Sequence, residues 1–331
     1  GLTCGLIGAG YKVVAAVEID KKARETYLLN YPQIPIIGED IRNLSVDEVL
    51  RRTHLIPGSL DLLAGCPPCQ GFSTIRIRNR ARAAVDPRND LIDEFARLAF
   101  GLKPKLIMME NVAGLAKYER FINFVTALKH VGYSVAYKIL DVSFYRVPQR
   151  RKRLILSANR LGPPALAESV GNRISVRQAI SMLPKAGTSG DILHDLESVS
   201  RTDRIQALIR SIPKDGGSRS SLAEHFQLNC HKRTTGFNDV YGRMRWDDVS
   251  PTITSGCTNP SKGRFLHPEE DRPITLREAA LLQGFPSDYK FDVNHGKESI
   301  SLMIGNALPP PFIAAHARIM AESLKSERQN K

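Results

Sequence analysis

The chain lacks any run of about eighteen apolar residues, so no segment of it is predicted to span a membrane. No secretory leader is expected, and only five of its 331 residues are cysteine. These cysteines show no pairing pattern, which argues against a disulfide-stabilised extracellular domain and predicts a reducing, cytoplasmic location. Acidic residues are in the minority: 34 Asp and Glu stand against 47 Lys and Arg, for a formal net charge of +13. A surface this basic favours a polyanionic partner, nucleic acid first.

What the chain does have is apolar sequence, 42% of its residues, enough for one large domain with a smaller one attached. In residues 1–158 short apolar strands alternate with amphipathic helices, which predicts a doubly wound, Rossmann-like α/β sheet. Residues 159–245 are richer in glycine, serine and charge and predict a smaller irregular domain, and 246–331 are predicted to return to the first domain. The predicted strands are 12–19, 36–41, 60–64, 105–109, 134–142 and 154–157. One helix is predicted to end at Gly10, and others cover 21–29, 89–101, 119–131, 175–183, 275–283 (with Thr275 and Glu278 as a capping box) and 305–323.

The segment Gly65–Ser73, which reads Gly-Cys-Pro-Pro-Cys-Gln-Gly-Phe-Ser, follows directly on a predicted buried strand. Its prolines and glycines end regular structure and predict a stiff turn at the carboxyl end of that strand, the edge at which open α/β sheets bind ligands. One interpretation is a nucleophilic thiol at Cys69, with Cys66 as a bystander. The alternatives are half of a zinc site, a redox dithiol or a buried structural cysteine.

Acidic residues follow other predicted strands. Glu18 stands where such sheets hold the hydroxyl groups of a ribose, whereas Asp20 is better placed to begin the next helix. Asp40 is a candidate acceptor for an adenine amino group, with Ile41 against the ring. Glu110 ends an apolar strand, where burial of a carboxyl group is costly unless the group has a function or a partner. It can donate a proton, pair with an arginine, or do both.

Basic residues cluster beside the candidate nucleophile. Residues 76–88 include five arginines and one acidic residue, and residues 146–177 include eight Lys or Arg and one acidic residue. Such clusters fit phosphate contacts to a nucleic acid. Arg151 and Arg153 are two residues apart, so a strand would place both on one face and let them reach the same site.

Three motifs together resemble the DNA cytosine-5 methyltransferases: Pro68–Gln70, Glu110–Val112 and Gln149–Arg153, in the order and spacing of that family. The resemblance covers almost all of the chain outside about 159–240. It extends to Glu18 with Asp20, Asp40-Ile41, Asp86–Leu91, Pro251–Thr254, Leu276–Gln283 and Gly305–Pro309.

The resemblance implies methyl transfer from S-adenosylmethionine to C5 of a cytosine flipped out of a specific duplex DNA sequence. It implies that Cys69 forms a covalent bond to C6 of the base, that Glu110 assists at N3 and the exocyclic amine, and that Arg151 and Arg153 orient the base and Glu110. It implies no metal, and it assigns target recognition to 159–245. The implied cofactor contacts are Glu18, Ile19, Asp40, Ile41, Pro68, Leu91, Asn306 and Ala307. The expected DNA contacts are Gln70, Ser73, Arg76, Arg78, Arg80, Arg82, Arg88, Gln149, Arg233 and Arg243.

One departure and three alternatives accompany this resemblance. The family opens with a strand and a glycine-rich turn that holds the methionine part of the cofactor, and Gly1-Leu2 matches only the tail of that motif, so we expect the preceding residues to be missing from the sequence. The alternatives are a tRNA cytosine-5 methyltransferase on the same scaffold, a non-catalytic sequence-specific DNA-binding protein and a nicotinamide oxidoreductase. The last is suggested by Gly5–Gly10 but disfavoured, because the predicted strand follows those glycines instead of preceding them. The expected partners are duplex DNA and a restriction endonuclease that acts on the same site, and the expected state is a monomer near the bacterial nucleoid.

Overall fold

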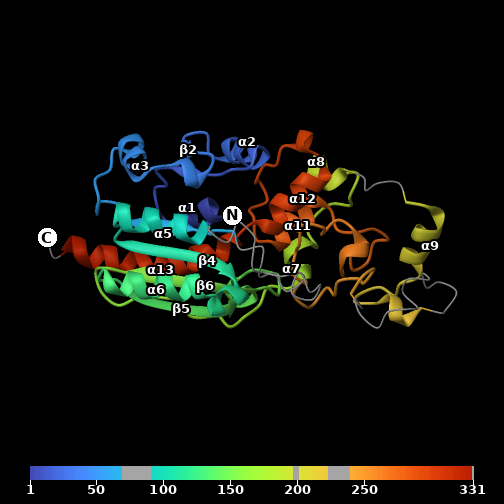
Figure 1. Cartoon of the computed structure of the whole chain (residues 1–331). Coiled ribbons are helices and arrows are strands. Elements are labelled where there is room, and N and C mark those ends of the chain that lie inside the picture. Colours follow the sequence, from blue (N-terminus) through green and yellow to red (C-terminus); the bar gives the residue numbers. More distant parts are fainter. Residues whose placement is uncertain (69–90, 197–200, 223–238, 330–331) are drawn as a thin grey trace. The chain divides into compact units, whose positions relative to one another are not determined.

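The computed structural model describes residues 1–68, 91–196, 201–222 and 239–329, and the chain divides into two compact units (Figure 1). Unit 1 consists of Gly1–Val142, Lys152–Ser169 and Pro310–Lys331. Unit 2 consists of Ser143–Arg151 and Val170–Pro309. No helix among the described residues is long and apolar enough to cross a membrane.

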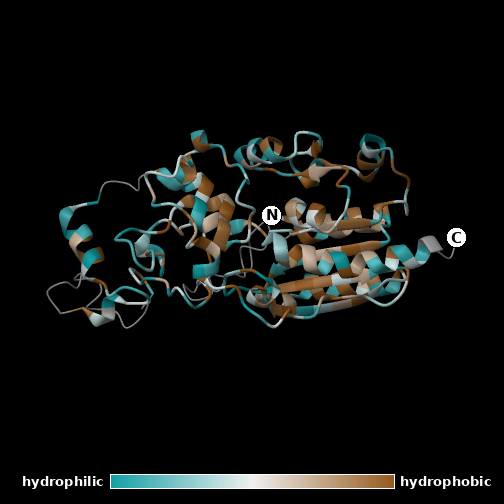
Figure 2. Cartoon of the chain, turned by 180° about the vertical axis from the view of Figure 1, so that it is seen from behind, coloured by the Kyte–Doolittle hydropathy of each residue, from teal (hydrophilic) through white to brown (hydrophobic). Residues whose placement is uncertain are grey.

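The centre of unit 1 is a four-stranded sheet in the order β3 (Leu62–Gly65), β4 (Leu106–Val112), β6 (Lys152–Asn159) and β5 (Ser134–Asp141). Strands β3 and β4 are parallel, and β6 is antiparallel to both of its neighbours. The first six residues of β4 are buried without alternation, as expected of a strand that is covered on both faces. Figure 2 shows β4 and β6 as the apolar interior of this unit.

Two helices, α5 (Leu91–Leu102) and α6 (Glu119–His130), cover one face of that sheet. Their apolar residues recur at helical spacing and meet every second residue of β4 and β6. The core that results contains Phe95 of α5, Phe121 and Phe124 of α6, and Met109 of β4. A second, two-stranded parallel sheet pairs β1 (Ala16–Val17) with β2 (Ile36–Gly38), flanked in sequence by α2 (Lys21–Asn30) and α3 (Val46–Thr53).

The first and last helices of the chain, α1 (Leu2–Gly8) and α13 (Pro310–Gln329), pack against each other in unit 1. The contact requires a glycine at position 5. A Cβ built on Gly5 would lie 2.6 Å from Cβ of Ile313 and 2.7 Å from the carbonyl oxygen of Pro310. The missing side chain therefore sets how closely the two helices approach.

Unit 2 is built from short helices joined by long loops. They are α7 (Val176–Ile180), α8 (Ile192–Asp195), α9 (Asp203–Ser211), α11 (Leu276–Leu282) and α12 (Lys297–Asn306). Helix α11 contacts α7, α8 and α12 and so forms the centre of this unit. The predicted capping box of α11 is confirmed, with Thr275 and Glu278 each accepting a hydrogen bond from the other's backbone N–H. Among the described residues, 3₁₀ turns are found at Ile41–Asn43, Ala113–Lys117, Val142–Tyr145, Arg219–Ser221, Pro260–Lys262 and Val293–His295.

Several predicted boundaries were wrong. The strand predicted at 36–41 ends at Gly38, because Asp40 caps the 3₁₀ turn that follows. The residues predicted to open the last helix, from Gly305, instead form the last turn of α12, and α13 begins at Pro310, where a proline fits the first helical position. Unit 2 extends to Pro309 and not to 245, since α11 packs on α7 and α8, and α12 packs on α11 within it.

Candidate active site and cofactor-binding edge

A buried ion pair joins Glu110 on β4 to Arg153 on β6. The antiparallel register places Val112 opposite Arg153, so Arg153 lies diagonally across from Glu110 on the same face of the sheet. Nε of Arg153 lies 3.1 Å from Oε1 of Glu110, and the two side chains are 15% and 2% exposed. The carboxyl group thus has the arginine partner that its position in an apolar strand required.

The other carboxylate oxygen of Glu110 is contacted by a thiol. Parallel pairing aligns Gly65 with Met109, so the next residue on each strand, Cys66 and Glu110, are neighbours at the carboxyl end of the sheet. Sγ of Cys66 donates to Oε2 of Glu110 at 3.3 Å. Cys66, interpreted from the sequence as a bystander, thus contacts the candidate catalytic carboxyl group, a neighbour that a sequence pattern does not show.

Asn111 holds the turn that follows β3. Its Nδ2 donates to the carbonyl oxygen of Pro67 at 2.7 Å, and its Oδ1 accepts from the backbone N–H of Val112 at 2.8 Å. Both β3 and β4 thus end in one hydrogen-bonded unit. No role was predicted for Asn111, although its place directly after Glu110 at the end of an apolar strand was a usable signal. Nine predicted site residues lie outside the described residues: Cys69, Gln70, Ser73, Arg76, Arg78, Arg80, Arg82, Arg88 and Arg233.

Arg151 does not share the environment of Arg153. Strand β6 begins at Lys152, so strand alternation does not apply to Arg151, and the predicted shared face was wrong. The guanidinium group of Arg151 is buried in unit 2, where it donates to the carbonyl oxygens of Ile253 and Gly305, each at 2.9 Å. Arg151 therefore ties together two of the segments that carry the family resemblance within that unit.

Gln149 belongs to the same buried network. Its Oε1 accepts from the backbone N–H of Ile253 at 2.9 Å, and its Nε2 donates to Oε1 of Gln283. Gln283 in turn donates to the carbonyl oxygen of Ala307. The side chain of Gln149, which was predicted to contact DNA, is fully buried.

The carboxyl ends of β1 and β2 carry the predicted cofactor residues. The backbone N–H of Glu18 donates to the carbonyl oxygen of Gly38, so the two chain segments leave the small parallel sheet side by side. Ile19 is 62% exposed beside them. Arg42 holds the pKa of Asp40 below its usual range through its side-chain and backbone hydrogen bonds to that carboxylate. Asp20, as predicted, caps α2 by accepting from the backbone N–H of Ala23 at 2.8 Å.

The remaining predicted cofactor residues lie at element ends. Pro68 is exposed after β3, and Leu91 begins α5 in unit 1. Asn306 is exposed at the end of α12 and Ala307 caps that helix, both in unit 2.

The family model for C-5 cytosine-specific DNA methylases matches residues 1–322. The chain belongs to that family. It is 35% identical to the Type II methylase M.HgiDII of Herpetosiphon aurantiacus, over 98% of this chain and 92% of that protein. It is 31% identical to the Type II methyltransferase M1.HphI of Haemophilus parahaemolyticus, over 99% of this chain and 85% of the relative. A mutant DNMT2 of Spodoptera frugiperda matches in fold, with a TM-score of 0.63, 18% identity and 96% of each chain covered. The chain is thus a DNA (cytosine-5) methyltransferase with the predicted Rossmann-like fold.

The methyltransferase keeps one predicted DNA contact, Arg243, in its core. This side chain is 0% exposed. Its guanidinium group donates to the carbonyl oxygens of Ile209 and Ile212 near the end of α9, and to Oδ1 of Asp271. The predicted base contact at Arg243 was therefore wrong: a cation in a polar stretch of sequence serves here to satisfy the last carbonyls of a helix.

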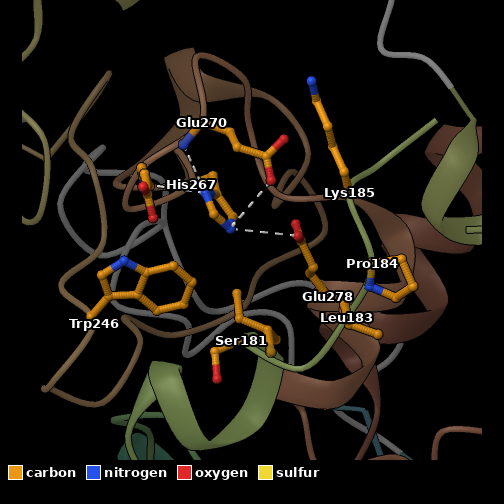
Figure 3. Close-up of a pocket in the computed structure, with 10 residues that line it drawn as sticks. Ser181, Leu183, Pro184, Lys185, Trp246, His267, Glu270 and Glu278 are labelled. Atoms are coloured by element: carbon orange, nitrogen blue, oxygen red, sulfur yellow. Dashed lines mark hydrogen bonds and ion pairs between the residues drawn. The ribbon is translucent and has the colours of Figure 1, made fainter. Parts of the chain in front are cut away.

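A cavity of about 320 Å³ lies in unit 2 of the methyltransferase (Figure 3). Nδ1 of His267 accepts from the backbone N–H of Glu270 at 2.9 Å, so Nε2 carries the ring proton and faces the carboxylates of Glu270 and Glu278. Burial lowers the pKa of His267, which keeps the ring neutral. Arg272 donates to both carboxylates, and Trp246 packs edge-on against the imidazole. Arg272 thus offsets part of the negative charge of the two carboxylates, and the neutral ring of His267 lies beside them.

Proposed function

We propose that the enzyme methylates C5 of a cytosine flipped out of a specific duplex DNA sequence, with S-adenosylmethionine as methyl donor and Cys69 as nucleophile. The observation that carries this proposal is the placement of Glu110. A carboxyl group that is 2% exposed is held by Arg153 and Cys66 at the carboxyl end of the sheet, next to the turn that leads to Cys69.

The reaction requires a nucleophile because C5 of cytosine is unreactive. Addition of the Cys69 thiolate forms a bond from sulfur to C6 and moves the C5–C6 π electrons toward C5 and N3. After methylation, loss of the C5 proton re-forms the double bond and expels the thiolate. Cysteine suits both steps, because a thiolate is a strong nucleophile and a good leaving group.

Glu110 would neutralise the negative charge that addition of the thiolate places on the cytosine ring. A proton delivered to N3 by its carboxyl group neutralises the developing negative charge. Arg153 holds Oε1 and carries a positive charge beside it, which orients the carboxyl group and stabilises the same charge. Arg151 acts as a positioning residue that fixes Ile253 and Gly305.

The residues at the carboxyl ends of β1 and β2 fit the adenosine part of the cofactor. Glu18 and Asp40 offer carboxylates for ribose hydroxyls and an adenine amino group, and the exposed Ile19 offers an apolar surface for a ring. When bound, S-adenosylmethionine supplies an electrophilic methyl group on a sulfonium centre. Pro68, Leu91, Ile41, Asn306 and Ala307 complete the proposed contacts.

Base flipping is the expected route to the cytosine, since a stacked base cannot be reached by Cys69. We assign phosphate contacts to the arginines between 76 and 88 and sequence recognition to the region that follows residue 159. The similarity to two Type II enzymes supports a place in a restriction–modification pair. In that case methylation by this enzyme protects its own target sequence from a partner endonuclease.

The test is a methylation assay with labelled S-adenosylmethionine on mixed-sequence duplex DNA and on bulk tRNA. We expect label in DNA that is lost in Cys69→Ser and retained in the matched variant Cys4→Ser. Sequencing of the methylated cytosines then gives the target site. Label in tRNA alone would replace the proposal with RNA methylation, and DNA binding without label in either would make the protein a non-catalytic binder.

A further inference from the structure

We propose that Cys66 is a positioning residue for methyl transfer, which holds the carboxyl group of Glu110 in its working orientation. This inference rests on the function proposed above. In this proposal Cys66, the first cysteine of the Cys-Pro-Pro-Cys turn, has a positioning role, whereas Cys69, the second, is the nucleophile.

The two oxygens of the Glu110 carboxyl group have different partners. Oε1 faces Nε of Arg153 at 3.1 Å, and Oε2 accepts from Sγ of Cys66 at 3.3 Å, an ordinary distance for a thiol donor. One contact comes from β6 and the other from the end of β3, on opposite sides of β4 in the sheet. Together they restrict rotation of the carboxyl group about its last bond, which neither could do alone.

The backbone on both sides of Cys66 is fixed. Gly65 pairs with Met109 in the parallel ladder, and the carbonyl oxygen of Pro67 accepts from Nδ2 of Asn111 at 2.7 Å. Pro67 is buried, and its ring fixes the backbone angle φ. Cys66 is therefore held between two anchored residues, and its thiol is presented to Glu110 by the same strand ends that lead toward Cys69.

A thiol suits this position because it is a weak and neutral donor at pH 7. A second cation at Oε2 would fix the carboxyl group as a carboxylate and oppose protonation. The S–H group orients Oε2 without adding charge. Glu110 can then take up and deliver a proton while its geometry is maintained.

The first experiment compares single-turnover methylation rates of three variants with the wild-type enzyme on DNA that contains the mapped target. Cys66→Ala removes the donor and should lower the rate about tenfold, with the dissociation constant for DNA unchanged within about twofold. Cys66→Ser keeps a donor and should restore most of the rate. Cys4→Ala removes a thiol elsewhere in unit 1 and should leave the rate unchanged. Equal rates for Cys66→Ala and wild type would overturn the inference, as would a loss in Cys66→Ser as large as that in Cys66→Ala.

The second experiment needs no catalysis. In the Cys69→Ser protein, alkylation of Cys66 by iodoacetamide is followed by mass spectrometry with and without the further change Glu110→Gln. A neighbouring carboxylate disfavours the thiolate, so Glu110→Gln should accelerate alkylation several-fold at pH 7. Unchanged alkylation would show that the thiol does not contact Glu110 and would overturn the inference.

The two experiments separate failure of the inference from failure of the proposed function. A wild-type enzyme that labels no nucleic acid would refute the proposed function, and with it a positioning role in methyl transfer. The alkylation rates would still decide whether Cys66 holds Glu110. Labelling by wild type combined with a fully active Cys66→Ala variant would refute the positioning role alone.

Discussion

The buried carboxyl group of Glu110 depends on Arg153 for a compensating positive charge. Arg153→Ala leaves the Glu110 carboxyl group 2% exposed without its cation, and we expect the free energy of unfolding to fall by about 3 kcal/mol. Arg120 is the matched control, because it pairs with Asp93 while both side chains are about half exposed. Arg120→Ala should cost about 0.5 kcal/mol or less. Urea denaturation of both variants measures the difference, and equal losses would contradict the argument.

The buried imidazole of His316 makes the free energy of unfolding depend on pH. Burial lowers the pKa of this histidine from its ordinary value of 6.5 to about 4. The unfolded chain therefore binds a proton at pH values where the folded chain does not. The stability that the neutral ring contributes is fully present above pH 6.5 and is lost as the pH falls toward 4, by up to about 3 kcal/mol.

Substitution of His316 isolates its share of this effect. Nδ1 of His316 accepts from the backbone N–H of Ala167 at 3.0 Å, and the amide oxygen of an asparagine can take that place. In His316→Asn the fall in unfolding free energy between pH 6.5 and 4 should be smaller than in wild type. His130→Asn, at an exposed position, should leave the slope unchanged. An unchanged slope in His316→Asn would assign the acid sensitivity to other groups, such as His267.

At the level of elements, Gly305 allows the last turn of α12 to lie directly on the backbone of Thr254 and Ser255. A Cβ on Gly305 would lie 2.3 Å from the carbonyl carbon of Thr254. Gly305→Ala should therefore cost about 2–3 kcal/mol of unfolding free energy. Gly8 lies in the last turn of α1 with nothing within 4 Å of its Cβ position, so Gly8→Ala should be neutral or slightly stabilising. Thermal unfolding compares the two, and a well-tolerated Gly305→Ala would refute the close approach.

Two capping boxes in unit 2 differ in burial. Thr275 caps α11, is buried, and also bonds Nδ1 of His194 at 2.8 Å through its hydroxyl group. Ser175 caps α7 at the surface with Gln178. Thr275→Ala should cost about 2 kcal/mol and Ser175→Ala about 1 kcal/mol, with Thr275→Ser close to wild type. A larger loss in Ser175→Ala, measured by urea denaturation, would contradict the role of burial.

The sequence predicted elements best where a local signal is strong. The continuous apolar run of β4, the helical spacing of α5 and α6 and the capping box of α11 all lie where periodicity and capping placed them. Helices α3, α9 and α12 were missed, although α3 begins at a Ser45 cap that accepts from the backbone N–H of Glu48. Gln149 and Arg243 were assigned to DNA because polar side chains in loops usually face solvent, and only tertiary packing shows that both are fully buried. The contact between Cys66 and Glu110 was not predictable either, because it depends on the register of two strands distant in sequence.

At the scale of the whole molecule, the net charge of +13 predicts salt-sensitive binding to DNA. The arginines 76–88 lie outside the described residues, so their assignment to phosphates is still a prediction from sequence. Replacing Arg76 and Arg78 together by alanine should weaken binding and reduce the slope of log affinity against log salt by about 2. The control replaces Arg120 and Lys325, two surface residues paired with acids, and should leave that slope unchanged. Fluorescence anisotropy over a salt series measures both, and equal slopes in the two variants would refute the assignment.

Because α1 packs on α13, unit 1 needs both the first and the last helix of the chain. On the ribosome, α13 emerges only after Val170–Pro309 has been synthesised, a delay on the order of ten seconds. During that interval α1 lacks α13, the helix that packs against Gly5. Unit 2, most of which is one continuous stretch, can mature meanwhile. Synthesis of unit 1 thus begins before that of unit 2, but unit 1 can be completed only after unit 2 has been synthesised.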